Sequence, residues 1–109
     1  MPTTYKVLGQ SNPAATTLTS LYTVPSSTST VVSSMTITNL GGSTATYRIA
    51  VRPAGAAISN QHYLAYDISI ATLDTMTLTL GLTLATTDVI SVYASTATMS
   101  FAAYGSEIS

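Results

Sequence analysis

The stretch that decides the fold is "TMTLTLGLTL", residues 75–84, in which apolar residues alternate with threonine and Gly81 interrupts the pattern once. Alternation with a period of two predicts a β-strand with one buried and one exposed face. The apolar face is formed by Met76, Leu78, Leu80, Leu82 and Leu84. The other face is formed by Thr75, Thr77, Thr79 and Thr83. Exposed strand faces commonly carry lysine and glutamate, so a face without any charge needs an explanation.

The low content of charged residues is the strongest signal in the composition. Charged residues make up 6% of the chain, whereas about a quarter is typical of soluble domains. Three basic and four acidic side chains give a formal net charge of −1, and proteins with so little net charge tend to associate. The chain has no cysteine, which excludes disulfides and thiolate metal sites. Burial of a core or assembly with other chains therefore has to stabilise it.

Short alternating segments recur along the chain, separated by turn-forming stretches such as "SNPAA" and "GGST". There are seven or eight of them, spaced about 8–12 residues apart, and none has a helical period. This spacing predicts an all-β fold with a single antiparallel β-sandwich, either jelly-roll or immunoglobulin-like. The length of 109 residues suits one domain, residues 1–109. Within it, residues 1–15 are a candidate for an extended arm.

Two further segments show how the alternation assigns side chains to the core. In "ATYRIAVRP" the pattern places Tyr47 and Ile49 on the core face and the arginines on the opposite face. In "HYLAYDISI", residues 62–70, the same alternation predicts four inward side chains, namely Leu64, Tyr66, Ile68 and Ile70.

His62 is the only histidine, and no spacing typical of nucleophiles, bases or metal ligands accompanies it. Acid–base and nucleophilic chemistry need such partners, so we predict that His62 is a hydrogen-bonding residue at a strand edge or an interface. Asp74 and Asp88 fall at turns, where a carboxylate accepts hydrogen bonds from nearby backbone N–H groups. We therefore expect a protein that is not an enzyme, with no catalytic residue, cofactor or metal ion.

Arg48 and Arg52 share one strand face, about 13 Å apart by strand rise. One interpretation pairs them with Asp67 across the sheet, where opposite charges stabilise the fold modestly. The other places them in a salt bridge between subunits, where charges determine register and specificity. The sequence leaves both interpretations open. It does not favour a nucleic-acid partner, because three basic residues neutralise few phosphates.

The tyrosines fall into two groups. Tyr22, Tyr47 and Tyr66 are in phase with core positions, whereas Tyr5, Tyr63 and Tyr104 fall outside that phase or at chain ends. The second group either packs under loops or anchors an interface, since tyrosine combines a large contact area with a polar tip. A platform for glycans is a further interpretation, which no motif supports.

Four quoted segments resemble one group of proteins over nearly the whole chain. They are "LYTVP", "RIAVRPAGA", "HYLAYD" and "GSE", at residues 21–25, 48–56, 62–67 and 105–107. In these segments the chain is similar to small virion proteins of tailed bacteriophages. The resemblance implies a β-sandwich component of a phage particle, in the head or in the tail, and it implies no catalytic residues.

The charge deficit and the resemblance favour the same functional hypothesis. A chain packed among many identical neighbours needs few charges, because other chains cover its strand edges and uncharged faces. We therefore expect a capsid decoration (cement) protein that oligomerises and contacts other virion proteins, coat or tail subunits. A tail, baseplate or fibre accessory protein and a module that binds host glycans are the alternatives. The candidate subunit interface comprises Thr75, Thr77, Thr79, Thr83, Arg48, Arg52, Tyr63 and Tyr104.

The sequence also predicts where the protein is found. The N-terminal stretch "MPTTYKVLGQ" lacks the basic start and apolar centre of a signal peptide. No apolar run approaches the roughly 20 residues of a membrane span. We therefore expect synthesis in the host cytoplasm, no membrane partner, and a final location in the virion.

Overall fold

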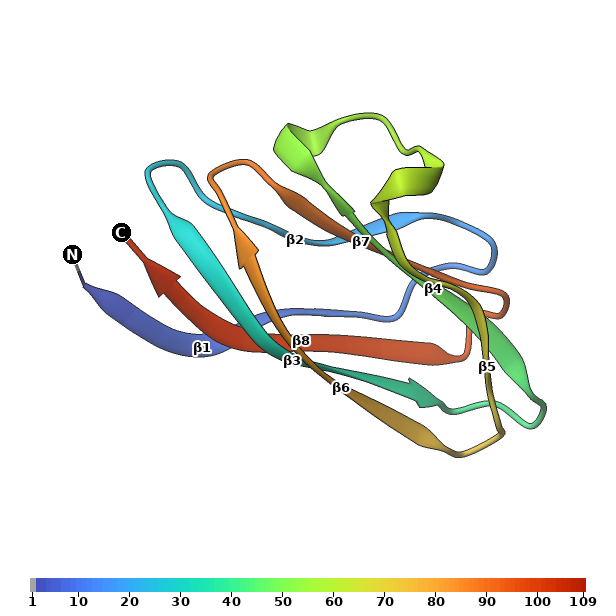
Figure 1. Cartoon of the computed structure of the whole chain (residues 1–109). Coiled ribbons are helices and arrows are strands. Elements are labelled where there is room, and N and C mark those ends of the chain that lie inside the picture. Colours follow the sequence, from blue (N-terminus) through green and yellow to red (C-terminus); the bar gives the residue numbers. More distant parts are fainter. Residues whose placement is uncertain (1) are drawn as a thin grey trace.

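The computed structural model describes residues 2–109, in which eight β-strands form two four-stranded antiparallel sheets (Figure 1). The strands are β1 (Thr3–Ser11), β2 (Thr19–Thr23), β3 (Ser29–Asn39), β4 (Ala45–Arg52), β5 (Tyr63–Ile70), β6 (Thr75–Leu84), β7 (Val89–Ala94) and β8 (Met99–Ile108). Two short 3-10 turns, η1 (Pro53–Gly55) and η2 (Asn60–His62), connect β4 to β5. The predicted all-β sandwich is confirmed.

The strand order identifies which sandwich this is. The first sheet has the order β1-β8-β3-β6 and the second sheet the order β2-β7-β4-β5. β1 pairs with β8, β2 with β7, β3 with β6 and β4 with β5, as though one long hairpin had been rolled up. Eight strands with this connectivity make a jelly roll. The immunoglobulin-like alternative has a different division of strands.

β6 has the bounds that the alternation predicts. Its threonines are exposed, and Met76, Leu78, Leu80 and Leu82 are partly buried against the core, as one inward and one outward face require. Gly81 has a φ of 70°, a conformation that glycine adopts without steric cost. The regular register with β3, from Thr38↔Thr75 to Ser34↔Thr79, breaks next to this glycine.

One apolar layer between the sheets forms the core. Met35 and Ile37 of β3 are fully buried in it. The Tyr47 ring of the second sheet meets the Phe101 ring of the first sheet edge to face, with centroids 6.4 Å apart, an arrangement that aromatic rings prefer. As predicted, Ile49 also lies in this layer. The central strands β3, β4, β7 and β8 contribute most of the buried side chains, whereas the edge strands β1 and β5 contribute one each, Leu8 and Ile70.

β5 is where the alternation misassigned side chains. Ile70 is buried, but Leu64, Tyr66 and Ile68 are exposed by 50%, 53% and 41%. Tyr66 lies on the outer face beside Arg48, so its predicted inward position is wrong. Ile68 stands opposite the core residue Tyr47, and Leu64 and Ile68 line a groove at the open side of the core without being buried. The pairing with β4 shifts register twice along this edge strand, and Asp67 has a φ of 53°. Such bulges insert extra residues and turn the following side chains away from their expected face.

Turn carboxylates behave as predicted. The Thr75 backbone N–H donates to Oδ1 of Asp74 over 2.9 Å, just before β6 begins. The carboxylate of Asp88 accepts from the Ala85 and Ala54 backbone N–H groups, each over 2.9 Å. Asp88 thereby ties the turn before β7 to η1.

Within the range 1–15, where an arm is a candidate, Thr3–Ser11 form the edge strand β1, and Met1 lies outside the described residues. β1 pairs with β8 from Thr3↔Ile108 to Ser11↔Phe101. The Ser109 backbone N–H donates to the Pro2 carbonyl over 3.1 Å. The two ends of the described chain therefore lie side by side (Figure 1).

We predict that Gly105→Ala destabilises the protein by about 1–3 kcal/mol, because added bulk in a packed site strains its neighbours. A Cβ atom at Gly105 would overlap the Val31 carbonyl oxygen on β3. Urea unfolding measures the effect. Gly42→Ala is the matched control, since a Cβ there meets no atom within 4 Å. Equal unfolding midpoints for the two variants would contradict the prediction.

Candidate interaction surface

The outer face of the first sheet is a continuous surface of uncharged side chains, which we call the threonine face. Strand pairing arranges it in rows across β6, β3, β8 and β1. From one end to the other the rows are Thr75, Thr38 and Ser100; Thr77, Thr36, Ala102 and Gln10; Thr79, Ser34, Tyr104 and Val7; and Thr83, Val31, Ser106 and Tyr5. No charged residue belongs to these rows.

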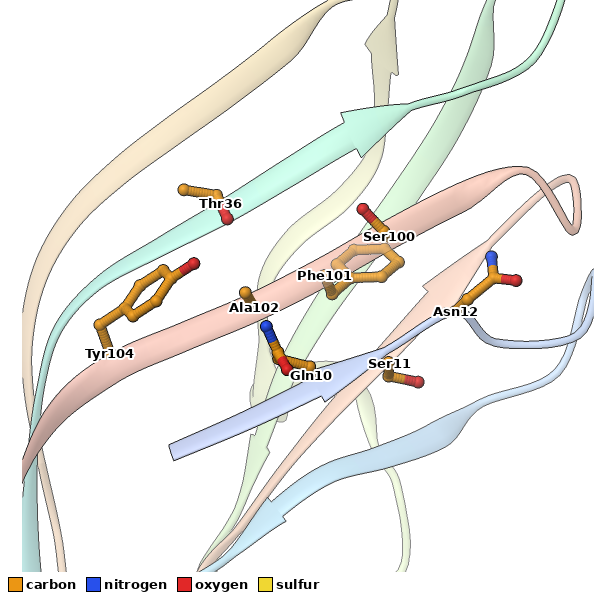
Figure 2. A pocket seen from close by; sticks show the side chains of 8 residues that line it. All are labelled: Gln10, Ser11, Asn12, Thr36, Ser100, Phe101, Ala102 and Tyr104. Carbon is orange, nitrogen blue, oxygen red and sulfur yellow. The ribbon is translucent and has the colours of Figure 1, made fainter. Parts of the chain in front are cut away.

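The rows extend the threonine pattern beyond β6. Thr36 and Thr38 of β3 stand directly opposite Thr77 and Thr75, and the hydroxyls of Thr38 and Thr75 are 3.2 Å apart, within hydrogen-bond distance. Figure 2 shows the second row continuing from Thr36 to Ala102 and Gln10. Cross-strand threonine pairs of this kind stabilise a sheet while keeping its surface flat and free of charge.

Tyr104 separates two hollows on the threonine face. One hollow, of about 440 Å³, runs beside Gln10, Thr36 and Ser100 (Figure 2). The other, of about 400 Å³, runs beside Tyr5 and Val31, and Lys6, which pairs with Glu107, is also part of its lining. A partly exposed tyrosine between two shallow hollows is suited to anchor a protein contact, because its ring offers area and its hydroxyl a hydrogen bond.

All seven charged side chains are engaged elsewhere in the molecule. Lys6 pairs with Glu107, and Arg48 pairs with Asp67. Asp74 and Asp88 accept hydrogen bonds at turns. Arg52 donates to the Ser91 hydroxyl over 3.1 Å and to the Ala56 carbonyl over 3.1 Å. Every charged side chain therefore has a partner within the chain, and none belongs to the rows of the threonine face.

Glu107 connects the two sheets through a polar group on the inner side of β8. It accepts a hydrogen bond from the Tyr22 hydroxyl over 2.5 Å and one from Lys6 Nζ over 3.0 Å. The Tyr22 hydroxyl is also 2.8 Å from the hydroxyl of Thr30. The bonds from Tyr22 and then Lys6 lower the pKa of Glu107. Burial, followed by the bond to Glu107, raises the pKa of Tyr22 to about 12.

A second cluster, centred on Arg48, lies on the outer face of the second sheet. Arg48 donates to both carboxylate oxygens of Asp67, over 2.6 and 3.2 Å, and this bond lowers the pKa of Asp67. The Arg48 guanidinium also lies 4.1 Å from the Tyr66 ring centroid and 4.2 Å from that of Tyr93. Of the two interpretations left open by the sequence, the pair with Asp67 across the sheet is present within the chain for Arg48 but not for Arg52.

His62 has a structural role. It is buried in η2, and its Nδ1 accepts a hydrogen bond from the Ser59 backbone N–H over 3.1 Å. The prediction of a hydrogen-bonding histidine agrees with this contact, although His62 ends a 3-10 turn and does not lie within a strand. Among residues 2–109, no group of three or more His, Cys, Asp or Glu side chains is arranged to hold a metal ion.

The structure divides the eight predicted interface residues between two faces. The four threonines of β6 and Tyr104 lie together on the threonine face, whereas Arg48, Arg52 and Tyr63 belong to the second sheet. Sequence reasoning missed Thr36 and Thr38 as members of the same surface. Their outward phase in "SSMTITN" is readable, but their neighbours depend on long-range pairing.

Comparison with protein-family models, with curated proteins and with solved structures gives no match. Between residues 2 and 109 there is no helix with the length and apolar character that crossing a membrane demands.

We predict that Glu107→Gln lowers the free energy of unfolding at neutral pH by about 1 kcal/mol, the scale of a net hydrogen bond. The pKa of Glu107 is lower in the folded than in the unfolded state, so its contribution is present above the unfolded pKa and lost as pH falls through the folded pKa. Denaturant unfolding between about pH 7 and 3 tests this. The gap between parent and variant should close in acid, and a gap that stays constant would contradict the assignment.

Proposed function

We propose that this chain is a non-enzymatic structural protein of a bacteriophage virion, most directly a capsid decoration protein that oligomerises and stabilises the particle. The observation that carries the proposal is the threonine face, which spans four strands without a charged residue. Such a face suits contact with other chains, because no charge has to lose its hydration when the face is covered. The resemblance of four sequence segments to phage virion proteins supports the same function.

The chemistry of the threonine face suits a partly hydrated protein contact. Hydroxyls can bond a partner directly or through water, and threonine methyl groups add apolar area. Tyr104, between the two hollows, supplies the larger anchor. We therefore assign the threonine face to the coat subunits of the particle.

The location on the particle is part of the proposal. Particles from a strain in which the coding gene is deleted should lack density at regular positions on the head that parent particles show in images. Loss of density from the tail alone would replace the decoration role by the alternative, a tail, baseplate or fibre accessory protein. Particles identical in density to the parent would overturn both.

We predict that Thr36→Lys, at the centre of the threonine face, weakens binding to particles by more than about tenfold, because the lysine loses hydration without gaining a partner. Purified protein is added to particles from the deletion strain, and the bound fraction is measured by sedimentation. Thr46→Lys is the matched control, since Thr46 is a partly buried threonine of β4, on the second sheet. Equal binding of both variants would contradict the assignment of the threonine face.

A second candidate function is recognition of a host saccharide, favoured by a hollow of about 480 Å³ lined by Asn60, Tyr63 and Tyr66. The rings of Tyr63 and Tyr66 meet edge to face with centroids 4.9 Å apart, and Arg48 holds the Tyr66 ring. Pairing with Asp67 neutralises Arg48, so the site is aromatic, polar and without net charge. Sugar rings suit such a site, since aromatic faces contact their C–H groups and amides bond their hydroxyls.

For this candidate, Tyr66→Ala should abolish binding of neutral oligosaccharides, measured by NMR titration of the purified chain with oligomers of glucose, galactose, mannose and N-acetylglucosamine. Tyr5→Ala is the control, because Tyr5 is 83% exposed on the first sheet, away from this hollow. A parent protein without spectral changes against the whole panel would remove the candidate.

A further inference from the structure

β6 is an edge strand whose regular part, residues 75–79, lacks the usual protection. Edge strands carry a row of unpaired backbone N–H and C=O groups, and proteins block them with charges, proline, bulges or short length. β2 has only five residues, β1 carries Lys6 and a register shift, and β5 carries Asp67 and two register shifts. β6 has ten residues with neither charge nor proline. Its register with β3 is regular over residues 75–79, before the irregularity at Gly81.

The free edge of β6 borders an apolar groove. This groove, of about 360 Å³, lies at the open side of the sandwich, between β6 and the edge strand β5. Met76, Leu78 and Leu80 line it from β6, and Leu64 and Ile68 line it from β5. Figure 1 shows both strands at this side of the molecule. Covering the groove would remove apolar surface from water, which favours association.

We propose that β6 pairs antiparallel with β6 of a second copy, around a two-fold axis near Thr77. Thr77 is the midpoint of the regular residues 75–79. Directly opposite residues of an antiparallel pair point to the same face. Threonine therefore stands opposite threonine and Met76 opposite Leu78, and the first sheets join into one sheet with a doubled threonine face.

The absence of charge on β6 favours a second copy of the chain as the partner that pairs with its free edge. Identical charged strands would place like charges opposite each other, which is destabilising, but two copies of "TMTLTLGLTL" have no such conflict. A two-fold contact is also closed, because each edge is used once and no open fibre results. The β6 pair is the contact that would form the oligomer of the proposed function. Its place in a particle rests on the proposed function, but the pairing itself does not.

The test is sedimentation equilibrium of the purified full chain over a range of concentrations. The parent should be a dimer, and Thr77→Lys should raise the dimer dissociation constant more than about tenfold, because two lysines meet at the axis. Thr36→Lys is the matched control: Thr36 stands opposite Thr77 in the same row, one strand away from the edge. It should remain a dimer although its binding to particles is weakened.

A charge-swapped pair makes the test specific. Thr77→Glu alone should also be monomeric, and an equimolar mixture of Thr77→Lys and Thr77→Glu should sediment as a dimer, because opposite charges then face each other. Circular dichroism checks that each variant is folded, and Thr79→Lys replaces Thr77→Lys if the latter unfolds. A monomeric parent, or a mixture that stays monomeric, would overturn the inference. Particle binding by a monomeric parent would overturn the β6 pairing alone and leave the proposed function standing.

Discussion

The apolar layer between the two sheets is the interaction on which the rest of the structure depends. The chain has no cysteine and few ion pairs, so burial of this layer is the main source of stability. The central strands supply most of its residues, including the fully buried Met35, Ile37 and Phe101. The intervening residues form the outer faces, and in this sequence they are mainly threonine, serine and tyrosine.

The sequence predicted those features that depend on local alternation. The bounds of β6, the core positions of Tyr47 and Ile49, and the turn roles of Asp74 and Asp88 all follow from patterns within a few residues. The charge deficit was readable in the same way, and it pointed to an uncharged threonine surface before its neighbours were known. What alternation supplies is the face on which a residue lies.

Features that depend on contacts distant in sequence could not be predicted. The choice of a jelly roll over an immunoglobulin-like sandwich lies in the strand order, and the rows of the threonine face lie in the register between β3, β6 and β8. The bulge at Asp67 reversed the expectation for Tyr66, because one inserted residue changes the phase of an edge strand. The contact of Arg48 with Tyr66 depends on that same bulge, whereas its contact with Tyr93 follows from the register between β4 and β7.

The pairing of the first strand with the last has a consequence for how the chain acquires its structure. Thr3 stands opposite Ile108, so the β1–β8 ladder cannot form until both strands have left the ribosome. Closing so long a loop costs chain entropy before any contact compensates for it, and folding rates fall as contacting residues become more distant in sequence. Folding of this molecule therefore requires both β1 and β8, and all-β topologies typically fold in about milliseconds to seconds.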